Sequence, residues 1–143
     1  MYVTSNFDIE DIMSKTDGFK GVYTKSDIPD IEKGESIIIN LDDDEGTHWV
    51  ACFHGDYIEY FDSFGLPPPN NVLNMMKRMN KKALYCTSQI QEATSTFCGY
   101  FCMYYIKKTK QDVPIYDILY QFKQLSPLQE GEGNDILRKY FSL

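Results

Sequence analysis

One stretch, residues 91–102, constrains this chain more than any other. It begins as a polar loop at Gln91 and becomes apolar at Cys98-Gly99-Tyr100-Phe101-Cys102. The apolar spacing predicts a helix over 98–109 that begins at a cysteine. The first backbone N–H groups of a helix lack partners and carry the positive end of its dipole, which favours a thiolate over a thiol. The sequence therefore predicts a reactive Cys98.

The surroundings of this cysteine suit acyl transfer. Gly99 leaves the backbone beside the sulfur uncrowded, so a substrate carbonyl can approach. Gln91, seven residues before the cysteine, offers a neutral side-chain donor that the loop can fold back towards the sulfur. A nucleophile, a backbone N–H and a neutral donor make an acyl-transfer site if the chain also supplies a base. The alternative is an inert core thiol, a role that fits the other three cysteines better: Cys52, Cys86 and Cys102.

A base is predicted from a β-hairpin. Two strand-like runs, 48–53 and 57–61, are joined by a short loop that contains Gly-Asp. His48 opens the first run and Asp62 follows the second, so antiparallel pairing predicts that the two side chains are neighbours. A carboxylate beside an imidazole fixes its tautomer and stabilises its protonated form. The alternative is that Asp62 begins an Asx-turn and His48 is a surface residue. His54 is predicted to be a solvated loop residue.

The remaining pattern predicts an α+β fold, with a small central mixed or antiparallel sheet flanked by helices, in a single domain over residues 1–143. Strands or extended segments are expected over 18–23, 36–40, 48–53, 57–61 and 83–86. Besides 98–109, helices are expected over 7–14 with Asn6 or Asp8 as the cap, from Asn70 as the cap to Met79, over 115–125, and over 134–142 with Asn134 as the cap.

Composition narrows the functional classes. The 143 residues are 43% hydrophobic and 24% charged, which is typical of a soluble globular chain. Its apolar runs are too short to cross a membrane, and no basic segment precedes an apolar one at the start, so no secretory signal is predicted. Reduced cysteines in an intracellular compartment, cytoplasm or nucleus, are therefore expected. Without a CxxC pair or zinc-finger spacing, no metal site is predicted.

The charge is distributed unevenly. Residues 1–62 hold fifteen acidic and four basic side chains, whereas the rest of the chain holds six acidic and ten basic ones, within a total of −7. Phosphate binding depends on Lys and Arg, so the acidic half argues against generic nucleic-acid binding. The small basic clusters after residue 76 are interpreted as solvent-exposed helix faces.

Three motifs, taken together and in this order, resemble the adenovirus-type (adenain-like) cysteine proteases, which belong with the SUMO and ubiquitin-like-protein (Ulp) proteases. The motifs are Gly46-Thr47-His48-Trp49-Val50, Tyr60-Phe61-Asp62-Ser63-Phe64-Gly65, and Gln91 with Cys98-Gly99-Tyr100-Phe101-Cys102. The order His, Asp, Gln, Cys matches the wider group, and the gap of seven between Gln and Cys matches the adenovirus branch. Residues 18–29 also resemble the segment before that branch's core strands. The short chain is most similar to the minimal proteases of DNA viruses, virophages and Maverick/Polinton elements.

The resemblance implies a role for each matched residue. Cys98, at the start of a central helix, would be the nucleophile, and His48 would be the general base and acid. Asp62 would orient His48, and Gln91 with the backbone N–H of Cys98 would form the oxyanion hole. Trp49 would wall a narrow channel that admits only glycine-like residues.

Gly99, beside the nucleophile, is expected to contact the substrate as Trp49 does. The expected function is a cysteine endopeptidase that cleaves after glycine in Gly-X-Gly or Gly-Gly sites through a thioester. Its substrates would be capsid or core precursors of a DNA virus or virus-like transposon, with packaging in a virion as one location. An isopeptidase for a ubiquitin-like modifier and a non-catalytic binding module remain alternatives.

The expected partner is a protein substrate, and the chain is expected to act as a monomer without metal, membrane or nucleic acid. Adenovirus relatives use a peptide activator and DNA as cofactors. The sequence requires no cofactor and allows an activating peptide, while its negative charge argues against DNA.

Overall fold

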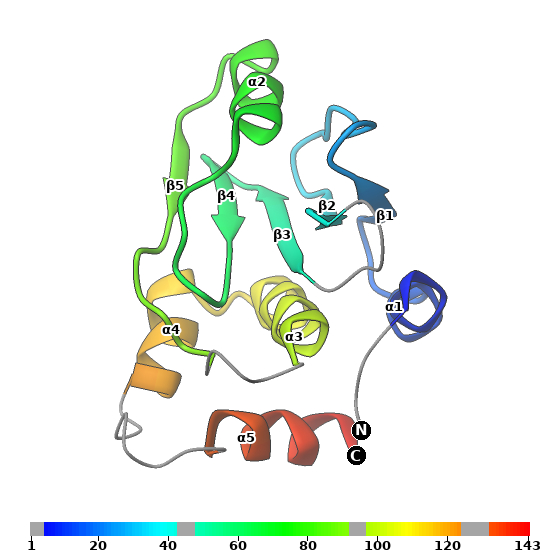
Figure 1. The fold of residues 1–143 in the computed structure, drawn as a ribbon, viewed down its shortest axis with the longest axis vertical. Helices are drawn as coiled ribbons and strands as arrows, with labels where there is room; N and C mark the ends of the chain where they lie inside the picture. Colours follow the sequence, from blue (N-terminus) through cyan, green and yellow to red (C-terminus); the bar gives the residue numbers. More distant parts are fainter. Residues whose placement is uncertain (1–4, 43–47, 92–96, 124–131) are drawn as a thin grey trace.

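The computed structural model describes residues 5–42, 48–91, 97–123 and 132–143. A five-stranded sheet crosses the molecule, as Figure 1 shows. Its strands, which are adjacent in numerical order, are β1 (Phe19–Thr24), β2 (Ser36–Asn40), β3 (Trp49–His54), β4 (Ile58–Phe61) and β5 (Ala83–Tyr85). Strands β2, β3 and β4 pair antiparallel, whereas β1 and β5 join the two edges in parallel. The sheet is therefore mixed.

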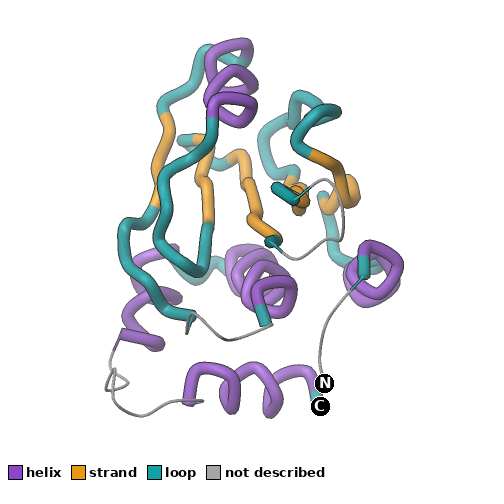
Figure 2. The backbone as a smooth tube through the Cα atoms, in the orientation of Figure 1, coloured by secondary structure: helices purple, strands orange, loops and turns teal. Residues whose placement is uncertain are grey.

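Helices cover both faces of this sheet (Figures 1 and 2). The described residues form five: α1 (Asn6–Met13), α2 (Asn70–Arg78), α3 (Cys98–Lys110), α4 (Ile115–Lys123) and α5 (Glu132–Phe141). Helix α2 packs on one face, and α3 packs on the other, against β3 and against α1, α4 and α5. The predicted α+β class is confirmed.

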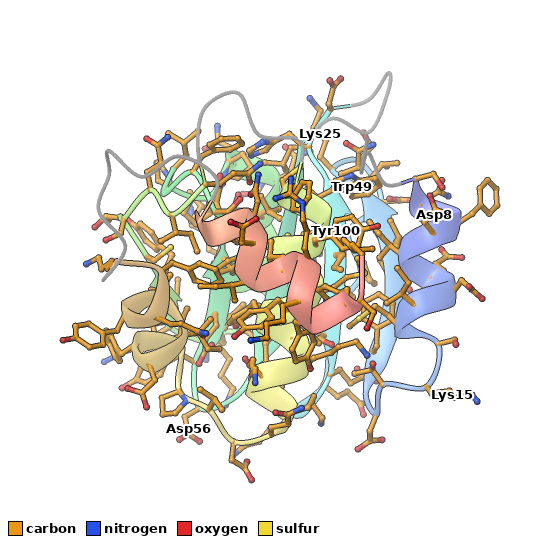
Figure 3. The ribbon with its side chains drawn as sticks, turned by 90° about the horizontal axis from the view of Figure 1, so that it is seen from below. Asp8, Lys15, Lys25, Trp49, Asp56 and Tyr100 are labelled. Atoms are coloured by element: carbon orange, nitrogen blue, oxygen red, sulfur yellow. The ribbon has the colours of Figure 1, made fainter. Side chains whose placement is uncertain are left out.

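Alternation along β3 explains why there are two cores. Trp49 and Ala51 belong to the cluster on the α3 face, whereas Val50 and Cys52 belong to the cluster on the α2 face. Helix α3 is buried along its first nine residues, 98–106. Figure 3 looks through α5 onto this helix. A helix with so little polar surface has to be enclosed, and α3 is the central helix of the molecule.

The β3–β4 hairpin places its two open ends together. Pairing runs from Ala51 opposite Phe61 to His54 opposite Ile58. The start of β3 and the end of β4 therefore meet at the end of the sheet away from the connecting loop. In Figure 3, Trp49 is labelled in the upper part of the view and Asp56 in the lower part, in agreement with this arrangement. The predicted hairpin is confirmed.

The prediction for His54 is wrong. His54 is the last residue of β3 and is buried, with Nδ1 2.8 Å from the carbonyl oxygen of Ile31. The segment before β2 covers it, since the backbone N–H of Gly34 donates to the carbonyl of His54. A hairpin pattern in the sequence contains no information about this third segment.

Helix boundaries differ from the expectation mainly at the caps. Ser5 caps α1 through a capping box with Asp8, so neither Asn6 nor Asp8 is the N-cap. Pro69 occupies the N-cap position of α2 and Asn134 lies inside α5, which makes these two cap predictions wrong as well. A cap must have extended backbone just before the first turn, and residue type alone does not locate that position. Residues 124–125 of the helix expected over 115–125 lie outside the described residues.

Candidate active site

An imidazole and a carboxylate meet at the open end of the hairpin. His48 lies just before β3 and Asp62 just after β4, and His48 Nε2 is 3.2 Å from Asp62 Oδ2. The Asp62 side chain is 1% exposed and that of His48 is 23% exposed. The predicted contact is confirmed. The imidazole can therefore keep one face towards a ligand while its carboxylate partner is shielded from water.

Two further contacts hold this pair. Asp62 Oδ1 accepts a hydrogen bond from the backbone N–H of Phe64 at 2.8 Å, which is an Asx-turn. The Phe64 ring stacks on the His48 ring, with centroids 5.3 Å apart and planes at 17°. The Asx-turn and the His48 contact were alternatives in the sequence, but the two carboxylate oxygens allow both. Phe64 was not expected to contact His48, and nothing in its residue type signals the contact.

Cys98 is the first residue of α3 and is 4% exposed. Burial raises the pKa of its thiol; hydrogen bonds from the backbone of Trp49, Gly99 and Cys98 itself oppose this, and the Asp62 charge raises the pKa further. The backbone N–H groups at the start of the helix lower the pKa, as expected, but burial has the larger effect. Loss of hydration outweighs these donors, so the net shift of the Cys98 pKa is upward.

The residue between His48 and Val50 connects the start of β3 to the predicted nucleophile. The backbone N–H of Trp49 hydrogen-bonds the Cys98 sulfur, and His48 is its chain neighbour. One turn further along α3, Cys102 Sγ donates to the Trp49 carbonyl oxygen at 3.3 Å. The start of α3 is thus fixed to the start of β3. The Trp49 indole is buried in the core on the α3 face, and its role as a channel wall stays a prediction.

Gln91 lies beside the same turn. Its side chain is buried, and its Oε1 accepts a hydrogen bond from the Ser63 hydroxyl. The Ser63 carbonyl oxygen accepts the backbone N–H groups of Ile90 and Gln91 at 2.9 and 3.0 Å. Residues 92–96, which complete the loop to α3, lie outside the described residues, as do Gly46 and Thr47 of the first motif.

The turn that carries Asp62 packs closely on the segment that carries Gln91. Gly65 closes the turn by donating its N–H to the Asp62 carbonyl oxygen at 2.8 Å. It has a φ of +74°, and a Cβ there would lie 2.7 Å from the Ser88 carbonyl carbon. Only glycine meets both conditions without strain. Ser63, Phe64 and Gly65 therefore contribute to the site, although the sequence analysis assigned a role only to Asp62 in the motif that contains them.

The described residues contain neither a cluster of metal ligands nor a long apolar helix. Within the described ranges, no three His, Cys, Asp or Glu side chains are grouped so that they could hold a metal ion. None of the helices found there is both long and apolar enough to span a bilayer. All four cysteines are in the described part of the chain, and no two of them form a disulfide.

No protein-family model matches the chain. The chain is 34% identical over 92 residues to the SUMO-1 cysteine protease S273R of African swine fever virus (isolate Tick/South Africa/Pretoriuskop Pr4/1996), a match that covers 53% of this chain and 34% of the relative. The same identity and coverage hold for the protein of strain Badajoz 1971 Vero-adapted, named Cysteine protease S273R. The chain therefore matches about a third of the length of these relatives.

Two solved structures share the fold. The crystal structure of the African swine fever virus pS273R protease aligns with a TM-score of 0.61 and 21% identity, over 81% of this chain and 60% of that chain. The central domain of the uncharacterized Lpg1148 protein from Legionella pneumophila aligns with a TM-score of 0.58 and 15% identity, over 98% of this chain and 94% of that chain. The chain thus has the fold of the pS273R protease, and about half of it is also similar to that protease in sequence.

Proposed function

We propose that this chain is a cysteine protease in which Cys98 is the nucleophile and His48 the general base. One observation carries the proposal. The His48–Asp62 pair lies at the end of the sheet where α3 begins with Cys98, and the Cys98 sulfur is hydrogen-bonded by the backbone N–H of the residue after His48. The sequence similarity to a viral protein named a cysteine protease agrees with it.

The chemistry begins from a neutral thiol. His48 Nε2–H donates to Asp62, so Nδ1 is the ring nitrogen that takes the thiol proton. The sulfur attacks the scissile carbonyl carbon of the substrate, and the carbonyl oxygen becomes an oxyanion. When the C–N bond breaks, the leaving amine takes the proton from His48 and a thioester remains. Water, deprotonated by His48, then attacks the thioester; the sulfur leaves and recovers the proton, and a carboxylic acid is released.

Two donors would stabilise the oxyanion, the Nε2 group of Gln91 and the backbone N–H of Cys98. The Gln91 side chain is buried beside the turn that holds Asp62, so its position is set by the fold rather than by solvent. Donors that are already in place cost no reorganisation during the reaction.

The proposed substrate is a protein with glycine before the scissile bond, such as a structural-protein precursor. Glycine is proposed because the three sequence motifs resemble those of proteases that cleave at glycine-containing sites, and Trp49, whose backbone contacts the nucleophile, is part of the first motif. A second candidate is removal of a ubiquitin-like modifier, because the viral relative bears the name SUMO-1 cysteine protease. Both substrates would use the same catalytic residues and would differ in the docking surface.

The test uses the purified chain with a fluorogenic Gly-Gly peptide and, separately, a ubiquitin-like vinyl ester. We expect peptide turnover that Cys98→Ala abolishes and that Gln91→Ala slows about 10²–10³-fold. Cys52→Ala is the matched control, because it removes a buried thiol on the opposite face of the sheet and should leave turnover intact.

The two reagents separate the candidates. Fast labelling of Cys98 by the vinyl ester with slow peptide cleavage would favour the isopeptidase. Turnover that survives Cys98→Ala would contradict the mechanism. A well-folded chain that reacts with neither reagent would instead favour the binding module.

A further inference from the structure

Ser63 makes three hydrogen bonds to the segment that carries Gln91. It is fully buried between Asp62 and Phe64. Its hydroxyl donates to Gln91 Oε1, and its carbonyl oxygen accepts the N–H groups of Ile90 and Gln91. Gln91 therefore depends on Ser63 for the position of its backbone and for the orientation of its side chain.

The orientation matters because the two ends of an amide differ only in chemistry. The Oε1 and Nε2 atoms occupy nearly the same shape, and hydrogen-bond partners decide which end points where. With Oε1 held by the Ser63 hydroxyl, Nε2 must point to the other side of the amide. An oxyanion needs a donor, so an amide turned by 180° would present a carbonyl oxygen and repel the developing charge.

We propose that Ser63 is a positioning residue that holds the Gln91 amide with Nε2 directed at the oxyanion. This proposal rests on the proposed protease function and adds a residue to it. Asp62 and Ser63, which are neighbours in one turn, then have separate roles. The Asp62 side chain orients His48, and the Ser63 side chain orients Gln91. The base and the oxyanion donor are aligned by two consecutive residues.

The test compares two reactions of Cys98 in Ser63→Ala. Peptide hydrolysis passes through an oxyanion, whereas alkylation by iodoacetamide displaces iodide and forms an S–C bond without one. We expect kcat on the Gly-Gly peptide to fall about 10-fold or more, within the 10²–10³-fold loss of a whole oxyanion donor, with KM nearly unchanged. The pH profile of Cys98 alkylation should match that of the wild type.

Three further variants sharpen the result. Ser63→Thr keeps the hydroxyl and should recover most of the lost kcat. On a Gln91→Ala background, Ser63→Ala should lower kcat by less than about twofold more, because positioning has no effect once the donor is gone. Ser36→Ala is the matched control, since Ser36 is also fully buried but its hydroxyl makes no hydrogen bond within the described residues. Its kcat should equal that of the wild type.

Each outcome bears either on the positioning role of Ser63 or on the protease function. An unchanged kcat in Ser63→Ala, or a full additional loss on the Gln91→Ala background, would overturn the proposal. If Ser63→Ala does not fold, Gln91→Glu gives the decision, because a carboxylate still accepts from Ser63 but offers no donor. A folded Gln91→Glu with wild-type kcat would also overturn it. No wild-type turnover on any glycine substrate would contradict the protease function itself, and the role of Ser63 with it.

Discussion

A few contacts decide what each side chain of the site can do. Asp62 uses one carboxylate oxygen for the Phe64 N–H and the other for His48, so it builds the turn and orients the imidazole together. Cys98 has backbone donors around its sulfur, yet burial raises its pKa. At this scale desolvation outweighs the helix terminus, and the proposed mechanism therefore needs His48 to remove the thiol proton during attack.

The raised pKa of Cys98 predicts slow alkylation at neutral pH. Since burial disfavours the thiolate, the rate in the folded chain should rise at higher pH than the rate of an unfolded thiol does. Iodoacetamide modification from pH 6 to 10, with peptide mapping in native buffer and in urea, measures the difference. A rate that is already maximal below pH 7, and is lost in His48→Ala, would mean that a thiolate–imidazolium pair exists before substrate binds.

Gly65→Ala should separate the two halves of the site. The new methyl group would lie within 3 Å of the Ser88 carbonyl carbon at a positive φ, so the turn has to move away from the segment that carries Gln91. We expect a loss of about 1–3 kcal/mol in the free energy of unfolding and a marked fall in kcat. Urea denaturation and peptide turnover measure both. Gly55→Ala, in the hairpin loop, is the control. Equal kcat in Gly65→Ala and the wild type would show that the close packing is not required.

At the scale of elements, α3 is fixed to the sheet at two points. Near its start, Cys102 bonds to the Trp49 carbonyl oxygen at the beginning of β3. In its middle, the Tyr105 hydroxyl donates to Glu59 Oε1 of β4 at 2.6 Å, and its ring stacks on Phe61 with centroids 4.7 Å apart. These contacts set the position of the helix along the strands, and with it the position of Cys98.

Tyr105→Phe should destabilise the fold without changing its shape. It leaves the Glu59 carboxylate, whose pKa burial raises and the Tyr105 hydrogen bond lowers, without that donor. We expect a loss of about 1.5–3 kcal/mol in the free energy of unfolding at pH 7, as for hydrogen bonds to charged groups. Glu59→Gln keeps an acceptor without the charge and should cost less than about 1 kcal/mol. Urea denaturation of both variants tests this, and a smaller loss in Tyr105→Phe than in Glu59→Gln would contradict it.

At the scale of the whole molecule, the sheet separates two cores, and both contain buried ionisable groups. Cys52 lies in the core on the α2 face, where burial raises its pKa from 9.0 to about 12. Cys102 and Tyr105 lie in the core on the α3 face, where burial also raises their pKa values. Burial thus favours the neutral, protonated forms of these side chains on both sides of the sheet.

The fold should therefore lose stability in alkali. Between pH 9 and 12 an unfolded Cys52 releases its proton while the folded one keeps it, so the stability that is complete below pH 9 falls as the pH rises. Each such group contributes about 1.4 kcal/mol per pH unit. Urea midpoints at pH 7, 9, 10 and 11 should decline, and less steeply in Cys52→Ala. The same slope in the wild type and Cys52→Ala would exclude Cys52 as a cause.

The sequence alone determined the features that depend on neighbouring residues. The apolar period of α3 and the alternation of β3 and β4 are local patterns, so they predicted the helix, the hairpin and the meeting of His48 with Asp62. Even there, the caps at Ser5 and Pro69 were missed, because residue type alone does not locate the extended backbone just before the first turn.

Only the tertiary structure decided the rest, because burial and hydrogen-bond partners depend on which distant segments pack together. The Ser63 hydroxyl reaches Gln91 across 28 positions, and His54 is buried by a segment 23 residues earlier. The parallel pairing of β1 and β5 at the two edges has the same long-range origin. The raised pKa of Cys98 follows from its enclosure, which no spacing of residues records.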